Sequence, residues 1–403
     1  MKYVVLGGAG AMGRITVKDL VMTCGHGEEI VIADFDLKKA AELARSCGKA
    51  NVSAVRVDVK DREGAARALK GAFVIVNAVQ YQLNIDVMEL ALAVKAHYVD
   101  LGGLFHVTRR QLKLDKRFKA AGLTAVPGMG AAPGITNILA HWGAERLDRV
   151  FEIHTRVGSM DKTRYEPKPA LAVSYSLKTI LEEFSLRPAV FTKGRFTFVD
   201  PMSGDVPHRF PAPIGLRRPM HTLHSEVATL PLSFKAKGVR EVSFKIAFDA
   251  EFVDRVRFLR DLGLASHEPV EVPSPDGGGS VRVAPVDVAN KVAMSQPAAR
   301  QVGPLKQYEV VRAIVKGIRG GRKLTWVLDC HTAGMPAWGI GLDIDTGSPP
   351  AVAAQMLAAG EISQRGVLPP EIAVPPEAFF KRLKKRGMTV KASRVPGWER
   401  VSA

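Results

Sequence analysis

The chain has 403 residues, of which 46% are hydrophobic and 24% charged, and a formal net charge of +17. This composition is typical of a globular protein, the length favours two domains, and the charge favours anionic ligands. The three cysteines have neither the spacing of a disulfide framework nor that of metal ligands, so we expect no metal site. No apolar run is close to the length of a membrane span, which is about 20 residues, and no signal-peptide pattern is present. We therefore expect a cytoplasmic protein without membrane contact.

The first 34 residues have the order of a dinucleotide-binding unit. The apolar run 2–6 predicts a buried strand, the glycine loop 7–13 leads into a helical pattern, and a second strand at 30–33 ends at Asp34. The residues expected to hold a pyrophosphate are Gly8, Gly10, Ala11, Met12 and Gly13. Among these, Gly8 is expected to permit the tight turn, and Gly13 to let the helix lie close to the strand.

Strands and helices continue to alternate as far as residue 126. Further strands are expected at 54–57, 72–76, 98–101 and 123–126, and helices at 38–46, 62–69, 85–95 and 111–121. Such alternation predicts an α/β fold with a Rossmann-type, doubly wound parallel sheet. Ligands of such sheets bind at the carboxyl ends of the strands. The polar residues expected at these ends are Asp34, Asp58, Asn77 and Asp100.

The acidic residues after the second strand bear on the choice of cofactor. Asp34 can accept both hydroxyls of a ribose, although a plain surface carboxylate is the alternative. Asp36 follows without an arginine beside it in the sequence, and two carboxylates would repel a 2′-phosphate, so we expect NAD rather than NADP. Asp58 lies on the adenine side or caps the helix 61–69. The expected cofactor-binding set is completed by Asn77, Ala78 and Val79.

The pattern changes after residue 126. Breakers at 127–134 indicate a loop, and a helix is expected at 136–147. Short alternating stretches predict an antiparallel sheet with strands at 152–157, 195–199, 239–248 and 308–316. A helix at 177–184, capped by Ser176, and a surface turn at 273–279 accompany the sheet. The second domain is therefore α+β and is expected at about 136–330.

The C-terminal region is expected to be helical. Residues 351–359 form a helical run, and the proline pair before it is suited to a helix start. The basic run 381–386 is interpreted as the solvated face of a terminal helix. Lys and Arg are otherwise spread along the chain rather than gathered on one element with aromatic residues, so we expect no nucleic-acid partner.

Several of these stretches together resemble the saccharopine dehydrogenase-like family, and within it the lysine 6-dehydrogenase type. The stretches are the N-terminal glycine loop, 77–84, 98–103, 130–137 and 366–371. The resemblance implies that residues 1–135 plus 343–403 form the nucleotide domain, with 136–330 as an inserted substrate-binding and dimerisation domain. It also implies a homodimer that oxidises an amino-acid C–N bond with a nicotinamide cofactor. At 222–230 the chain departs from the lysine 6-dehydrogenase pattern, which leaves the substrate open.

Oxidation of an amine requires a group that takes a proton from the ammonium. Asp100 is one candidate, with capping of the following turn as its alternative, and Tyr81 either orients the substrate or is an ordinary packed aromatic. His224 and Glu226 would share one face of an extended segment, where they could hold a proton or bind an ammonium group. The alternative for this pair is a surface position on a strand.

The resemblance places two further residues, Tyr175 and Ser176, in the substrate-contact stretch. Three functions remain open. The first is an NAD-dependent amino-acid dehydrogenase of the lysine 6-dehydrogenase kind, and the second is a saccharopine or other opine-type dehydrogenase acting on a secondary amine with extra carboxylates. The third is a non-catalytic, NAD-sensing regulator, against which Asp100 and Tyr81 argue.

Overall fold

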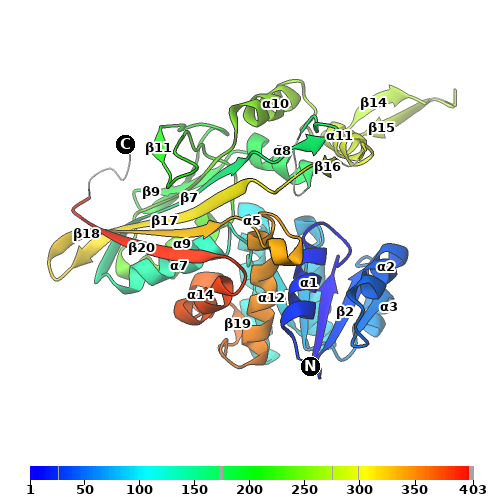
Figure 1. The fold of residues 1–403 in the computed structure, drawn as a ribbon, viewed down its shortest axis with the longest axis horizontal. Coiled ribbons are helices and arrows are strands. Elements are labelled where there is room, and N and C mark those ends of the chain that lie inside the picture. Colours follow the sequence, from blue (N-terminus) through cyan, green and yellow to red (C-terminus); the bar gives the residue numbers. More distant parts are fainter. Residues whose placement is uncertain (26, 172–175, 275, 298, 399–403) are drawn as a thin grey trace.

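The first sheet has seven parallel strands in the order β19-β6-β5-β4-β1-β2-β3 (Figure 1). The computed structural model describes residues 1–25, 27–171, 176–274, 276–297 and 299–398. The strands are β1 (Lys2–Leu6), β2 (Glu29–Asp34), β3 (Val52–Arg56), β4 (Val74–Asn77), β5 (His97–Asp100), β6 (Thr124–Val126) and β19 (Gly366–Val367). This order reverses between β1 and β4, which confirms the expected doubly wound sheet.

Both faces of this sheet are covered by helices, because its strands are apolar on both sides. Neighbouring residues of β1 show this, since Val4 and Val5 are both fully buried but belong to different apolar clusters. One face packs on α1 (Gly13–Thr23) and α2 (Leu37–Cys47), and the other on α3 (Arg62–Ala68), α4 (Asn84–Val94) and α6 (Asp115–Ala120).

The expected helix at 111–121 is only partly correct. The structure has α5 (Leu104–Gln111), a 3₁₀ turn at Leu112–Leu114, and then α6. Helix α5 starts directly after Gly102 and Gly103, which the sequence pattern indicated as a turn. A turn and a helix start share these residue types, so the pattern did not separate them.

The second sheet is mixed rather than antiparallel. Its order is β10-β9-β13-β7-β17-β18-β20. The strands are β7 (Arg149–Asp161), β9 (Ala189–Thr192), β10 (Arg195–Phe198), β13 (Glu241–Ala247), β17 (Gln307–Arg319), β18 (Arg322–Thr332) and β20 (Thr389–Pro396). The exception is β13, which runs parallel to β7. The long connection between these two strands allows the crossover that a parallel pair needs.

Helices and small strand pairs surround this second sheet. The helices are α7 (Ile135–Glu145), α8 (Leu177–Ser185), α9 (Glu226–Ser233), α10 (Ala250–Asp261) and α11 (Pro285–Met294). The strand pairs are β8 (Tyr165–Glu166) with β16 (Arg300–Gln301), β11 (His208–Arg209) with β12 (Leu216–Arg217), and β14 (Val270–Pro273) with β15 (Ser280–Val283). Ser176 caps α8 as expected, accepting a hydrogen bond from the Thr179 N–H. None of the described helices is both long and apolar enough to cross a bilayer.

The C-terminal region divides between the two sheets. Helix α12 (Ile344–Ala358) packs on α1 and β19 joins the first sheet, but β20 is an edge strand of the second. The expectation that 343–403 returns wholly to the nucleotide domain therefore fails for its last strand. Helix α12 also begins before the proline pair, so that Pro349 and Pro350 lie inside it and leave two carbonyl groups without an intrahelical donor.

The basic run at 381–386 is not wholly solvated. It spans the end of α14 (Pro376–Lys384), which follows the short helix α13 (Pro370–Ala373). Lys381 and Lys384 are exposed, but Arg386 is only 2% exposed. The prediction of a solvated run is wrong for Arg386, because this residue pairs with the buried Asp19 of α1, near the other end of the chain.

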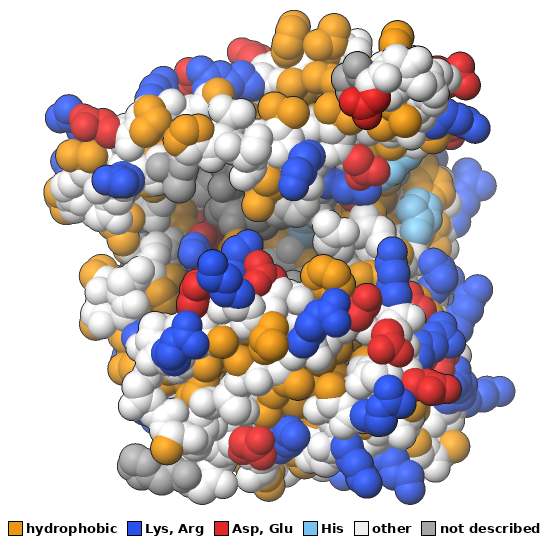
Figure 2. All heavy atoms as spheres, turned by 90° about the vertical axis from the view of Figure 1, so that its right-hand side faces the viewer, with side chains coloured by type: hydrophobic (Ala, Val, Ile, Leu, Met, Phe, Trp, Pro, Cys, Tyr) orange, Lys and Arg blue, Asp and Glu red, His pale blue; other side chains and the backbone are white. Residues whose placement is uncertain are grey.

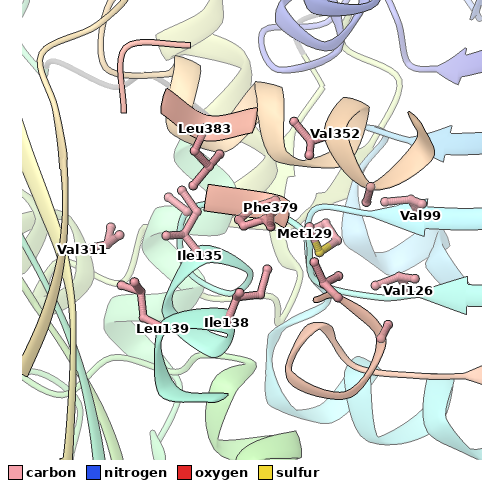
Figure 3. Close-up of a cluster of buried hydrophobic side chains, with 14 of the residues drawn as sticks. Val99, Val126, Met129, Ile135, Ile138, Leu139, Val311, Val352, Phe379 and Leu383 are labelled. Atoms are coloured by element: carbon pink, nitrogen blue, oxygen red, sulfur yellow. The ribbon is translucent and has the colours of Figure 1, made fainter. Parts of the chain in front are cut away.

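One apolar cluster connects the two sheets (Figure 3). It includes Val99 and Val126 from the first sheet, Val311 from the second, and Ile135 and Phe379 from the helices between them. Because this core is continuous, the two sheets are held at a fixed relative position. Figure 2 shows that a recess remains between the two domains on one face of the molecule.

Candidate active site

The glycine loop after β1 has the close contacts that a dinucleotide site requires. Gly7, with φ of +74°, takes the left-handed turn that was expected of Gly8. A Cβ on Gly8 would lie 2.8 Å from Ile32 and from the Val5 carbonyl, so Gly8 is instead needed for close packing. A Cβ on Gly13 would lie 2.1 Å from the Gly7 oxygen, so α1 approaches the strand as closely as expected.

The start of α1 fits a pyrophosphate. Within the described residues, no acceptor takes the backbone N–H groups of Ala11, Met12 and Gly13, whereas the N–H of Gly10 is bonded to the Gly7 carbonyl. Three free N–H groups at a helix N-terminus are the donors that phosphate oxygens need. Across the loop, the peptide of Ala78 lies against Gly7, and the Val79 N–H bonds to the Asn77 side chain.

Asp34 ends β2 beside this loop. Its carboxylate accepts the N–H groups of Ala9 and Asp36, each at 3.0 Å, which fixes its orientation beside the glycine loop. An arginine is nevertheless close, contrary to the sequence expectation. Arg56 is the register partner of Asp34 in β3, and its guanidinium lies 5.0 Å from the centre of the Phe35 ring. The sheet brings together residues that are 22 positions apart, so inspection of neighbours in sequence could not find it.

Asp58 follows β3 at the same edge of the sheet. Its side chain accepts the Lys60 N–H at 2.9 Å. Helix α3 is capped by Asp61, which accepts the Gly64 N–H at 3.0 Å, so the alternative role of Asp58 as the helix cap is wrong. Asp58 remains at the carboxyl end of the edge strand.

Asp100 is surrounded by hydrogen-bond donors. It is 1% exposed, and five donors reach it. They are the Gly102 and Gly128 N–H groups and the side chains of Tyr98, Gln111 and Asn84. Burial raises the pKa of Asp100, and these hydrogen bonds oppose that rise. A carboxylate with five donors connects the neighbouring loops by hydrogen bonds and has a structural role. This geometry argues against Asp100 as the base.

Asn77 belongs to the same buried network. It is 1% exposed and donates to Asn84 at 2.9 Å and to Tyr98 at 3.1 Å. Its side chain therefore links the ends of β4 and β5 rather than pointing into the crevice.

His224 and Glu226 form a buried pair at the junction of the domains. His224 Nδ1 lies 2.6 Å from Glu226 Oε2, and the two side chains are 8% and 0% exposed. The pair does not lie on an extended segment, because Glu226 begins α9, and the alternative of a surface position is also wrong. Thr136 donates to the other carboxylate oxygen of Glu226 at 3.0 Å, and the His224 ring stacks on Phe244 at 3.8 Å.

The surroundings of His224 tune its charge. Burial alone would lower its pKa, but the carboxylates of Glu226 and Glu183 outweigh burial and raise that pKa. Within the described residues, no hydrogen bond reaches Nε2 of His224. The adjacent Ser225 accepts the Gly103 N–H at 3.4 Å, which places the pair beside the carboxyl end of β5.

Tyr81 contacts the second domain directly. It donates to Glu182 at 2.8 Å, and His267 lies 3.0 Å from the same carboxylate. Burial and Glu182 raise the pKa of Tyr81. Ser176 caps the helix that carries Glu182, whereas Tyr175 lies outside the described residues.

The sequence interpretation missed two glutamates at this junction, Glu182 and Glu183. They are 2% and 4% exposed. Glu183 follows Ile180 by three positions, which puts an acid on the apolar face of a predicted helix. An acidic residue on the apolar face of a predicted helix is unusual, and this feature of the sequence could have identified Glu183 as a candidate site residue. The described residues contain no group of three or more His, Cys, Asp or Glu side chains arranged to hold a metal ion.

Comparisons with known proteins show the family of the chain. Residues 3–126 match the saccharopine dehydrogenase NADP binding domain, and residues 130–388 match the saccharopine dehydrogenase C-terminal domain. The chain belongs to the saccharopine dehydrogenase family. It is an NAD(P)-dependent oxidoreductase, and its first domain binds a nicotinamide dinucleotide.

Relatives match along almost the whole chain. Carboxyaminopropylagmatine dehydrogenase of Synechocystis sp. is 22% identical, with 96% of each chain covered. Carboxynorspermidine synthase of Vibrio cholerae is also 22% identical, with 94% of each covered. The family assignment from sequence is thus confirmed, while the finer likeness to lysine 6-dehydrogenase is not reflected in these names.

Solved structures share the fold. Saccharopine dehydrogenase (L-Glu forming) of Saccharomyces cerevisiae superposes with a TM-score of 0.71 at 16% identity, covering 98% of this chain and 99% of the other. Homospermidine synthase of Legionella pneumophila, solved in complex with NAD, gives 0.65 at 12% identity, covering 98% and 91%.

Proposed function

We propose that this enzyme makes or oxidises the C–N bond of a secondary amine that joins a carboxylate-bearing chain to a cationic chain. This is the opine-type alternative that the sequence left open. It is supported by the names of the two relatives, both of which describe carboxylated amines. The observation that carries it is the buried His224–Glu226 pair beside the carboxyl end of β5, in which Nε2 of His224 takes no hydrogen bond from the described residues.

His224 is the proposed proton acceptor. A protonated secondary amine has no lone pair to assist the departing hydride, so it must first lose its proton. Neutral His224 accepts that proton at Nε2, while Glu226 holds the Nδ1–H and stabilises the imidazolium that results. Thr136 fixes the orientation of Glu226. The nicotinamide cofactor, when bound, supplies the hydride chemistry.

Glu183 is the proposed recognition site for the positive charge of the substrate. Its carboxylate raises the pKa of both His224 and Tyr81, and its carbonyl accepts the N–H of Leu223 at 3.1 Å, so it lies near both side chains. A buried negative group there favours an ammonium beside it. Tyr81 then orients the substrate from the side of the first domain, as expected from sequence, and Ser176 does so indirectly through the helix that it caps.

Four further expectations are part of the proposal. The preferred cofactor is NAD, supported by Asp34, although Arg56 nearby makes NADP the alternative to test. Asp58 contributes on the adenine side of the same edge. The substrate and dimerisation domain spans 136–330, supported by the family boundary between residues 126 and 130. The enzyme acts as a homodimer, as the family resemblance implies.

A substrate screen tests the function. Oxidation should be followed by NADH and NADPH absorbance with saccharopine, carboxynorspermidine, carboxyaminopropylagmatine and lysine. We expect one of the three secondary amines to give the highest kcat/KM. A higher kcat/KM for lysine would instead favour side-chain deamination, and would contradict the proposal.

A further inference from the structure

The outer face of the second sheet carries a row of like charges. Lys245 in β13, Arg156 in β7 and Arg312 in β17 are successive register partners, so their side chains stand next to each other on one face. We call these three residues the basic row. Side chains alternate between the two faces of a strand, and Ile153 of β7 points into the apolar core that the two domains share. Arg156, three positions further along β7, therefore lies on the opposite face, away from α7. Figure 1 shows β11 on this outer side.

The basic row is only partly neutralised. Arg312 forms a bidentate pair with Asp329, at 2.6 and 2.8 Å. No described carboxylate is paired with Arg156, and its buried Nε has no hydrogen-bond partner. Burial and Arg312 lower the pKa of Arg156 to about 10, and burial and Arg156 lower the pKa of Lys245 to about 8. Like charges directly opposite each other destabilise a sheet, and an unpaired buried cation adds to that cost.

The remaining acids near the row have other partners. Asp205 raises the pKa of Lys245 but pairs with Arg218 at 3.1 Å. Glu152, two positions from His154 on the same face, pairs with His154 at 3.1 Å and with Lys316 at 2.8 Å. Among the described residues, Arg156 therefore has two cationic neighbours and no paired carboxylate.

Two histidines form a wall above the row, but only His208 can donate from it, because His221 Nδ1 donates to the Phe244 carbonyl at 3.2 Å. Arg312 donates to His208 Nε2 at 3.0 Å, so the proton of that neutral ring is on Nδ1. This Nδ1 is buried without a partner, and His208 is 0% exposed. The Lys245 ammonium and the His221 ring meet at Gly204, where an added Cβ would lie 2.9 Å from Lys245 Nζ and 2.8 Å from the ring. Burial and the neighbouring cations lower the pKa of His208 to about 3 and that of His221 to about 4, so both rings stay neutral.

We propose that the basic row, with His208 as its wall, binds a small oxyanion, a carboxylate or a phosphate group, on the face of the second domain that is turned away from the cofactor crevice. Arg156 supplies the unpaired Nε–H, Lys245 a second charge, and His208 a neutral donor. Charge-assisted hydrogen bonds of this kind are the strong ones, and they would remove the repulsion between Arg156 and its two neighbours. The site does not depend on the proposed reaction.

Isothermal titration calorimetry tests this site by measuring the binding of inorganic phosphate and of succinate. The full enzyme is used with NADH or NADPH at saturation, so that the glycine loop cannot take the anion. We expect saturable binding of one anion per chain, weakened tenfold or more in Arg156→Gln. The control is Lys391→Gln, which removes a cation at the far end of the same register row, beyond Asp329, and should bind normally. Tighter binding of phosphate identifies a phosphate ester as the natural ligand class, and tighter binding of succinate a carboxylate.

Melting temperature gives an independent measure. Without an anion, Arg156→Gln should melt at the same or a higher temperature than the wild type, because it removes repulsion. Lys245→Met is the second variant, for the case in which Arg156→Gln does not fold. The proposal fails if neither anion binds saturably, or if the control weakens binding as much as Arg156→Gln. It also fails if Arg156→Gln leaves anion binding unchanged. A loss of self-association in that variant would then indicate that a carboxylate of a second copy fills the site.

Discussion

Arg386 and Asp19 form a buried ion pair between the two ends of the chain. Arg386 Nε and Nη2 lie 2.5 and 2.6 Å from the two carboxylate oxygens of Asp19, and the side chains are 3% and 0% exposed. Gln355 of α12 accepts a further hydrogen bond from Arg386 at 3.1 Å. The pair joins α1, which follows the glycine loop, to the segment between α14 and the last strand of the second sheet.

Removing Arg386 should destabilise the protein strongly. Arg386→Met leaves the Asp19 carboxylate buried and unpaired, and losing one partner of such a pair costs about 3–5 kcal/mol. Chemical denaturation measures this loss. Lys385→Met is the matched control, because Lys385 is exposed and should change little. The double variant Arg386→Met with Asp19→Leu should recover part of the loss, and equal stabilities of Arg386→Met and wild type would contradict the assignment.

Asp100→Asn should lower the stability of the protein. In the variant, an NH2 group replaces one carboxylate oxygen and cannot accept the hydrogen bonds that the surrounding donors make to that oxygen. Each buried donor left without an acceptor costs about 1–3 kcal/mol. We expect a reduced unfolding free energy and a reduced melting temperature. A variant with wild-type stability but strongly reduced turnover would restore Asp100 as the base.

The first domain was predictable from sequence because its signals are local. The hydrophobic periodicity and the spacing of the glycines depend only on neighbours in the chain. They predicted the parallel sheet, the glycine loop and the position of Asp34 at the end of the second strand. The partners of Asp34 and Arg386 were not predictable, because Arg56 and Asp19 are brought to them by sheet register and by helix packing. The His224–Glu226 pair was recognised by residue type, but its position at a helix start depends on Thr136 and Phe244, which come from other elements.

Asp34→Ala should weaken NAD binding far more than NADP binding. The lost hydrogen bonds to a ribose hydroxyl are charge-assisted and contribute about 1.5–3 kcal/mol. The complementary variant, Arg56→Gln, should weaken only NADP. Asp36→Ala, which removes the second carboxylate and the α2 cap, should leave NAD binding unchanged and relieve part of the repulsion of the 2′-phosphate of NADP. Titration of cofactor fluorescence gives the dissociation constants, and a wild type that binds NADP more tightly than NAD would overturn the preference.

His224→Gln should lower turnover by roughly 10²–10⁴, the usual weight of a positioned acid–base group. In the oxidative direction His224 must be neutral, so kcat/KM should rise with pH through a pKa above the ordinary value of 6.5. Glu226→Gln removes the main group that raises this pKa, and burial then lowers it. The acid limb of the profile should therefore move to lower pH, with a lower plateau. His267→Gln is the control, because His267 pairs with Glu182 and not with this dyad. An acid limb that stays in place in Glu226→Gln would assign the titrating group elsewhere.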